Sequence, residues 1–128
     1  PGDVLVIGMD GKLTRSTEPY QTTVVGVYSS QPAFLGNGGE DGGLDGRVPL
    51  ALVGVVPVKV SAENGSIKPG DLLVASATAG HAMRVEPVVI NGVTFYPSGV
   101  VIGKALAGFK GGKKGKNTGM IPVFVALH

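Results

Sequence analysis

Short apolar runs separated by glycine, proline and asparagine dominate the chain. The runs over residues 4–7, 22–30 and 49–60 are rich in valine and other β-branched residues, which favour strands. No stretch repeats its apolar residues with the 3.6-residue period of an amphipathic helix. The pattern predicts an all-β fold, a compact barrel or sandwich of about eight to ten short strands.

The last part of the chain predicts a terminal hairpin over residues 99–127, with a loop rich in glycine and lysine between its strands. Period-two alternation divides the last strand between two faces, one with Ile121, Val123, Val125 and Leu127 and the other with Pro122, Phe124 and Ala126. Both faces are apolar. We therefore expect this strand to be interior or to be covered by a neighbouring subunit.

Turn signals divide the remaining strands. Asp10-Gly11 predicts a type I′ hairpin turn, and Asn64-Gly65 and Asn91-Gly92 predict further tight turns. Periodicity disappears over residues 31–47, which predicts a long glycine-rich surface loop. Pro57 cannot donate a main-chain hydrogen bond, so an edge, a bulge or a bend is expected there.

The phrase Pro-Gly-Asp, followed by two aliphatic residues and a valine, occurs at the start of the chain and again in its second half. The match predicts a pseudo-repeat between residues 1–30 and 69–107 inside a single domain, 1–128. Proline presets φ, glycine supplies the turn and aspartate can accept hydrogen bonds from nearby main-chain N–H groups. This architectural role is favoured over an acid pair of Asp3 and Asp71.

Composition and charge narrow the classes of function. The chain is 43% hydrophobic but only 5% aromatic, so its core must consist of aliphatic residues. The absence of cysteine excludes disulfides and thiolate chemistry. A net charge of +2 does not favour specific nucleic-acid binding, and no apolar run approaches the roughly 20 residues of a membrane span. No cofactor is expected.

Candidate catalytic residues are few. A Ser–Lys dyad, as in some self-cleaving β-rich peptidases, would pair Ser76 with Lys104, which apolar residues flank on both sides. Such a lysine must be buried to lower its pKa. His81 is a candidate general base. Two further possible pairings are Ser61 with Lys59 and Ser61 with Lys68. The sequence offers no motif for an orienting group or an oxyanion hole, so a structural role is favoured for all of them.

Two glycine-rich loops carry opposite charges. The acidic loop contains Glu40, Asp41 and Asp45, and the basic loop contains Lys113, Lys114 and Lys116. Asp41 and Asp45 are weak candidates for binding a cation, because their spacing does not match a calcium-binding loop. The opposite charges instead suggest that the two loops meet across a subunit interface.

The order of several motifs resembles a known family. The segment VPLALVGVVPVKVSAENGSIKPGDLLVASATAGHAMRV, followed by GVVIGKALA and GMIPVFVAL, resembles a C-terminal β-domain of bacterial and phage surface proteins of tail-fibre or tail-spike type. It is also distantly similar to the autoproteolytic C-terminal domains of phage neck appendages. Two departures stand out: Val55 occupies a position where related sequences often have arginine, and the hairpin INGVTFYP is inserted before GVVIGKAL.

The resemblance implies a non-enzymatic module that caps and oligomerises a fibre-like protein, with a homotrimer favoured. It implies an extracellular, cell-surface or virion location. Self-cleavage from the fibre is the alternative, with Ser76, Lys104 and His81 as candidates. A second alternative is a glycan- or ligand-binding tip, with the loop 31–47 and three tyrosines as contacts. These tyrosines are Tyr20, Tyr28 and Tyr96.

Overall fold

A computed structural model of the chain describes residues 1–29, 50–111 and 117–127. These residues form eleven strands and no helix, which confirms the all-β prediction. The number exceeds the eight to ten expected, in part because Leu52 separates two strands in a segment that reads as one run.

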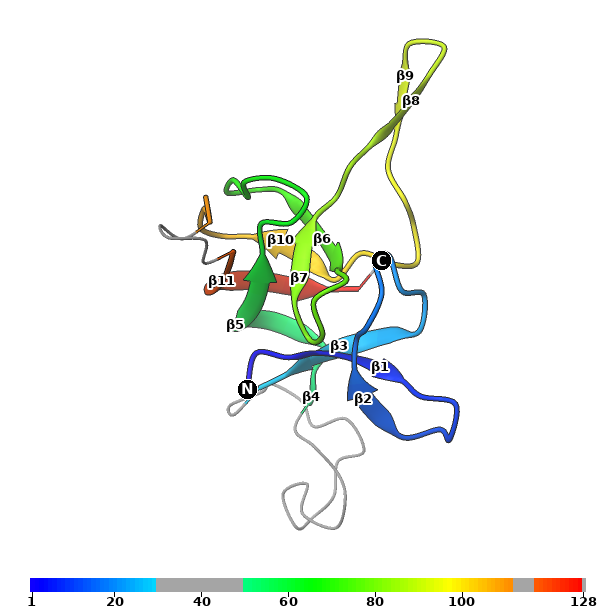
Figure 1. The fold of residues 1–128 in the computed structure, drawn as a ribbon, viewed down its shortest axis with the longest axis vertical. Helices are drawn as coiled ribbons and strands as arrows, with labels where there is room; N and C mark the ends of the chain where they lie inside the picture. Colours follow the sequence, from blue (N-terminus) through cyan, green and yellow to red (C-terminus); the bar gives the residue numbers. More distant parts are fainter. Residues whose placement is uncertain (30–49, 112–116, 128) are drawn as a thin grey trace.

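The strands form two sheets and a separate hairpin (Figure 1). The first sheet has the order β2-β1-β3-β4 and consists of β1 (Val4–Ile7), β2 (Leu13–Arg15), β3 (Val24–Tyr28) and β4 (Leu50–Ala51). The second is a closed barrel of order β10-β11-β5-β7-β6, made of β5 (Val53–Ser61), β6 (Leu72–Ala75), β7 (Ala82–Arg84), β10 (Gly103–Ala105) and β11 (Thr118–Ala126). The hairpin pairs β8 (Val88–Ile90) with β9 (Val93–Phe95) and extends away from both sheets. We call this hairpin the arm.

The two Pro-Gly-Asp phrases make equivalent main-chain contacts. The N–H of Gly2 donates to the carbonyl of Tyr28, whose own N–H donates to Asp3 O, at 2.7 and 2.8 Å. In the second phrase, the N–H of Gly70 donates to Ala105 O and the N–H of Ala105 donates to Asp71 O, at 2.7 and 2.9 Å.

The strands that follow the two phrases also pair alike. Leu5 in β1 lies opposite Arg15 in β2 and Gly26 in β3, while Leu73 in β6 lies opposite Arg84 in β7 and Gly103 in β10. The three-stranded units β2-β1-β3 and β7-β6-β10 therefore share one arrangement. In the second unit, the arm is inserted along the chain between β7 and β10.

A single aliphatic core joins the first sheet to the barrel. Its buried side chains come from both, with Val4, Val6 and Val27 in the first sheet and Val58, Leu73, Ile102 and Val123 in or beside the barrel strands. A smaller cluster of Val74, Met83, Val85, Val100 and Val101 lies on the other side of β6 and β7, against Tyr20 and Leu72. The buried aliphatic residues thus form two clusters, of which the larger joins the first sheet to the barrel.

Pro57 lies within an uninterrupted strand, so the expected bulge is absent from β5. It lies opposite Pro122 in β11, and the register runs without a shift from Val53↔Ala126 to Ser61↔Thr118. Neither proline can donate to the other, so the pair must occupy a non-hydrogen-bonded position of the antiparallel ladder. Two prolines can face each other here because neither is required as a donor between these two strands.

The turn predictions have mixed outcomes. Asn91 and Gly92 both have positive φ, 51° and 78°, as the type I′ turn of the arm requires. The type I′ prediction for Asp10-Gly11 is wrong, because only Gly11 has positive φ. Asp10 instead accepts a hydrogen bond from the N–H of Lys12 at 2.9 Å, which stabilises a longer loop. Residues 31–47 lie outside the described part of the chain.

Candidate functional site

Ser76 is fully buried at the end of β6, and its hydroxyl is used within a turn. The hydroxyl donates to the carbonyl of His81 at 2.7 Å and accepts the N–H of Thr78 at 3.2 Å. These bonds close the turn between β6 and β7. Ser76 therefore stabilises the turn, and its oxygen does not face solvent.

His81 belongs to the same turn and is half-buried. Its Nδ1 lies 2.8 Å from the carbonyl oxygen of Ala79, which is consistent with a protonated Nδ1 that donates to that oxygen. Ser76 contacts the main chain of His81, and the ring of His81 contacts Ala79. The arrangement differs from a serine–histidine pair, in which the ring would accept the hydroxyl proton.

Lys104 is exposed, so it lacks the burial that a Ser–Lys dyad requires. It lies in β10 opposite Leu72 in β6, with its side chain on the outer face of the barrel. Ser76 follows Leu72 by four residues, about 13 Å along a strand at roughly 3.3 Å per residue. Chain position and exposure therefore separate Ser76 from Lys104.

The residues of the two alternative dyads, Ser61 with Lys59 and Ser61 with Lys68, also have other partners. Ser61 is buried and accepts the N–H of Glu63 at 3.1 Å, while Lys59 forms an ion pair with Asp3 at 3.1 Å. The N–H of Lys68 donates to a carboxylate oxygen of Asp71 at 2.8 Å. The predicted capping role therefore applies to Asp71, whereas Asp3 is a buried partner for cations.

Glu63 holds the turn that contains Ser76 and His81. It accepts hydrogen bonds from the Thr78 hydroxyl at 2.7 Å and from the N–H of Ala77 at 3.0 Å. Burial by itself would raise the pKa of Glu63, but the hydrogen bonds from Thr78, Ser61, Ala77 and Ser76 outweigh it and lower the pKa below 4.5. The carboxylate is a structural acceptor for this turn.

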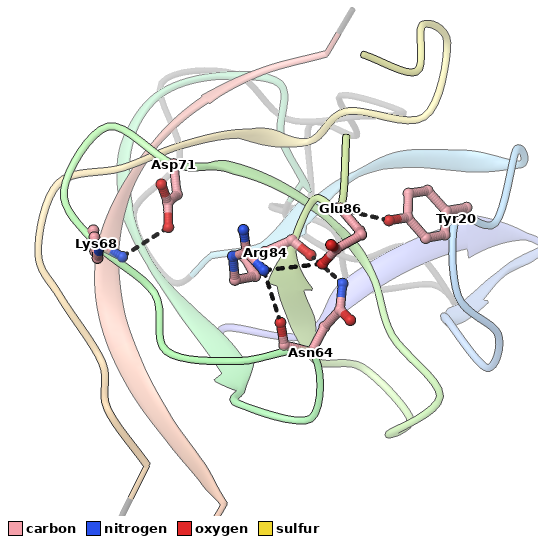
Figure 2. Close-up of polar contacts among 6 residues, drawn as sticks. All are labelled: Tyr20, Asn64, Lys68, Asp71, Arg84 and Glu86. Atoms are coloured by element: carbon pink, nitrogen blue, oxygen red, sulfur yellow. Dashed lines mark hydrogen bonds and ion pairs between the residues drawn. The ribbon is translucent and has the colours of Figure 1, made fainter. Parts of the chain in front are cut away.

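A polar network at the base of the arm fixes the direction in which the arm leaves the barrel (Figure 2). Arg84 donates to the Asn64 carbonyl at 3.1 Å and forms an ion pair with Glu86 at 3.0 Å, and the Asn64 side-chain amide donates to Arg84 O. The N–H of Glu86 donates to the Tyr20 hydroxyl at 2.9 Å. The network thus joins the first sheet's loop, the barrel and the arm.

Tyr20 is held in an uncommon conformation at this point. Its φ is 55°, a left-handed value that costs a non-glycine residue on the order of 1 kcal/mol. Two bonds stabilise it there, from its own N–H to the carbonyl of Ala75 at 3.1 Å and from Glu86 to its hydroxyl. This hydroxyl, which the sequence suggests as a glycan contact, accepts the N–H of Glu86 at the base of the arm.

A pocket of about 460 Å³ opens beside the same network. Its lining is Gly70, Asp71, Leu72, Arg84, Val85, Pro87, Tyr96 and Lys104. Arg84 already has Glu86 as an ionic partner. The other charged residues of the lining are Asp71, which accepts the N–H of Lys68, and the exposed Lys104. Tyr28 lies apart from the pocket, in β3 of the first sheet.

An exposed apolar surface lies on the outside of the barrel. The outer side of β5 and β11 carries exposed Val53, Val55, Pro57, Met120, Pro122 and Phe124, which we call the barrel face. Met120 and Phe124 are 50% and 43% exposed, although the strand's other side is buried. The predicted alternation of the last strand is correct, and its second apolar side is uncovered in the single chain.

The arm exposes a second apolar surface. Its large side chains are between 51% and 64% exposed: Val88, Val89, Ile90, Val93, Phe95 and Tyr96. The sequence showed the inserted hairpin but gave no signal that it leaves the barrel. Alternating apolar residues look alike in a core strand and in a projecting one, so this surface was missed.

Several predicted site residues lie outside the described residues, namely Glu40, Asp41, Asp45, Lys113, Lys114 and Lys116. Within the described ranges, no group of three or more histidine, cysteine or acidic residues is arranged to hold a metal ion. In that same part of the chain, no helix is long and apolar enough to cross a membrane.

Comparison with protein-family models finds no match to the chain, and comparisons with curated proteins and with solved structures find no significant similarity. The resemblance to fibre domains therefore stays a prediction, and functional arguments depend on the chain's own surfaces.

Proposed function

We propose that the chain is a non-enzymatic assembly module that self-associates and caps a fibre-like extracellular or virion protein. The observation that supports self-association is the pair of uncovered apolar surfaces, the arm and the barrel face. The motif resemblance supports the fibre context and favours a trimer. No catalytic geometry at Ser76, His81 or Lys104 competes with this proposal.

The size of the apolar surface supports association. Four arm side chains that share one side of the hairpin, Val88, Ile90, Val93 and Phe95, together expose on the order of 400 Å², taking roughly 150–200 Å² for a fully exposed large side chain. The largest contiguous apolar patch on a typical monomer is about 300–600 Å². This side of the arm alone lies within that range, and the barrel face adds to it.

The arm also needs a partner on structural grounds. A two-stranded hairpin is only marginally stable in water unless another surface covers it. The strands of the arm pair only with each other among the described strands. A structure that leaves such a hairpin uncovered in the monomer favours burial between subunits.

The proposal is tested by measuring the mass of the chain in solution from below 1 µM to 100 µM, by native mass spectrometry and light scattering. We expect a closed oligomer of defined stoichiometry, with three copies favoured. A monomer over the whole range would contradict the proposal.

Self-cleavage makes a different prediction for the same measurement. A longer chain would lose mass at a defined bond, and replacement of Ser76, His81 or Lys104 would stop the loss. The assembly module predicts that these replacements alter stability at most.

A further inference from the structure

We infer that the arm of one copy docks on the barrel face of a neighbouring copy. This inference depends on the proposed self-association and names the two surfaces that meet. The occupant of the barrel face is thus a second copy of this chain, and the contacting segment is β8–β9.

The arm has one continuous apolar side. Val88 lies opposite Phe95 and Ile90 lies opposite Val93, so these four side chains share one face of the two-stranded ribbon. The intervening pair, Val89 and Thr94, points to the other side. The arm is therefore a two-stranded ribbon with an aliphatic and aromatic docking side and a more polar reverse side.

The barrel face matches this ribbon in width and chemistry. It is also two strands wide, with Val55 opposite Phe124 and Pro57 opposite Pro122. The two prolines carry short side chains, and a hollow of about 450 Å³ lies over them. The residues lining the hollow are Val55, Val56, Pro57, Met120, Ile121 and Pro122. A hollow of this kind can receive a large apolar side chain from a second sheet packed on the first.

The arm and the barrel face do not cover each other within one chain. Both are exposed in the single chain, and Figure 1 shows the arm extending away from the barrel. The arm and the barrel face together present on the order of 1,000 Å², close to the lower limit for a specific interface and below the roughly 1,200–2,000 Å² of standard ones. An arm-to-face contact between copies therefore covers both surfaces at once.

The base of the arm is preorganised for docking. Arg84, Asn64, Glu86 and Tyr20 form the network that fixes the arm's direction. A ribbon already held in position loses less conformational entropy on binding than a free one. The network thereby has a role in recognition although none of its residues belongs to the docking side.

Charge favours a second copy over a lipid surface as the partner. Segments that insert at a membrane interface commonly carry lysine or arginine beside their apolar residues. Residues 85–103 contain neither lysine nor arginine, and Arg84 at the base of the arm is paired with Glu86. The arm therefore lacks the cations that would attract anionic lipid.

The contact joins different surfaces of the two copies, so it can close by reciprocal exchange of arms in a two-fold pair or by repetition around a ring. Repeating such a contact by rotation generates a closed ring if the rotation closes. A ring of three is the smallest ring beyond a two-fold pair, and it agrees with the trimer favoured by the motif resemblance.

A complementation experiment tests the inference. Ile90→Lys places a charge on the docking side of the arm, and Val55→Glu places one on the barrel face. Both residues are exposed, at 54% and 63%, so we expect both variants to fold, which circular dichroism checks. Each variant alone should be monomeric at a concentration where the wild type assembles.

An equimolar mixture of the two variants should form mixed complexes, because the intact arm of Val55→Glu can dock on the intact face of Ile90→Lys. Native mass spectrometry distinguishes the two chains by mass. Val89→Lys on the reverse side of the arm is the matched control. A second control is Met9→Glu, because Met9 is fully exposed in the hairpin loop of the first sheet. Both control variants should assemble like the wild type.

The outcomes separate this inference from the proposed function. If Ile90→Lys assembles as the wild type does, or if the mixture yields no mixed complex, arm-to-face docking is wrong while self-association stands. A monomeric wild type contradicts both. A monomeric wild type that binds anionic phosphatidylserine vesicles, with binding lost in Ile90→Lys, assigns the arm to a membrane and overturns the inference.

Discussion

Asp3 and Asp71 occupy equivalent positions in the two Pro-Gly-Asp phrases, yet their side chains have different partners. The Asp3 carboxylate is 9% exposed and contacts Lys59 at 3.1 Å and Arg15 at 3.5 Å. The Asp71 carboxylate is partly exposed and accepts one main-chain N–H, from Lys68. The same residue type thus joins β1 to β5 in one copy and closes a turn in the other.

This difference predicts unequal costs for equivalent substitutions. Asp3→Asn leaves Lys59 partly buried without its ionic partner and should lower the free energy of unfolding by about 1–3 kcal/mol. Asp71→Asn retains an acceptor oxygen and should cost about 0.5 kcal/mol or less. Urea unfolding at a fixed protein concentration measures both. Equal costs would show that burial of Asp3 has no energetic consequence.

Gly103 is required because two strands approach closely at this residue. A Cβ there would overlap the carbonyl oxygen of Phe124 and lie 2.9 Å from the Val125 Cα. Gly103→Ala should therefore cost about 3 kcal/mol or more, because main-chain atoms of β11 would have to move. Gly108→Ala is the control: its nearest neighbour would be 3.2 Å away, so its cost should be small. Similar melting temperatures for the two variants would contradict this account.

At the scale of elements, the turn between β6 and β7 depends on a carboxylate from another loop. The lowered pKa of Glu63 means that its ionised form is favoured by folding. Its contribution to stability is therefore present above pH 4.5, its ordinary pKa, and is lost as the pH falls through the lower pKa of the folded state.

We expect Glu63→Gln to reduce the loss of stability on acidification below pH 4.5. Thr78→Val, which removes the 2.7 Å bond to the carboxylate, should reduce it as well. Denaturant unfolding at pH 7 and at several values below pH 4.5 measures the slope. An unchanged slope in Glu63→Gln would assign the acid sensitivity to other groups.

Element type was predictable because it depends on local pattern. The valine-rich runs are strands, and Asn91-Gly92 forms the expected tight hairpin turn, of type I′, because both residues tolerate positive φ. The partner of Pro57 was not predictable, since the matching proline in β11 lies 65 residues away and only strand pairing shows that the two face each other. Local pattern predicts strands, but it does not predict which strand lies beside which.

The exposure of single side chains and the contacts between charged residues were less predictable, because they too depend on which strands lie side by side. Lys104 has apolar neighbours along the chain, but strand alternation turns its side chain outward. The network at the base of the arm joins Tyr20 to Glu86, residues far apart in sequence. Such contacts depend on the packing of the first sheet against the barrel, which a single sequence does not specify.

At the scale of the whole molecule, one aliphatic core joins the first sheet to the barrel, and two apolar surfaces are left outside it. These surfaces, the arm and the barrel face, differ in shape: one projects and the other carries a hollow. A projecting and a receiving surface on the same chain favour repeated contacts between identical copies. Self-association is therefore the central claim of this account.

The most direct test is the mass of the wild-type chain by sedimentation velocity, from below 1 µM to 100 µM. The account predicts one closed species of defined stoichiometry that persists on dilution into the low micromolar range. A single species with the mass of one chain at every concentration would contradict it, and would leave the two apolar surfaces without the partner proposed for them.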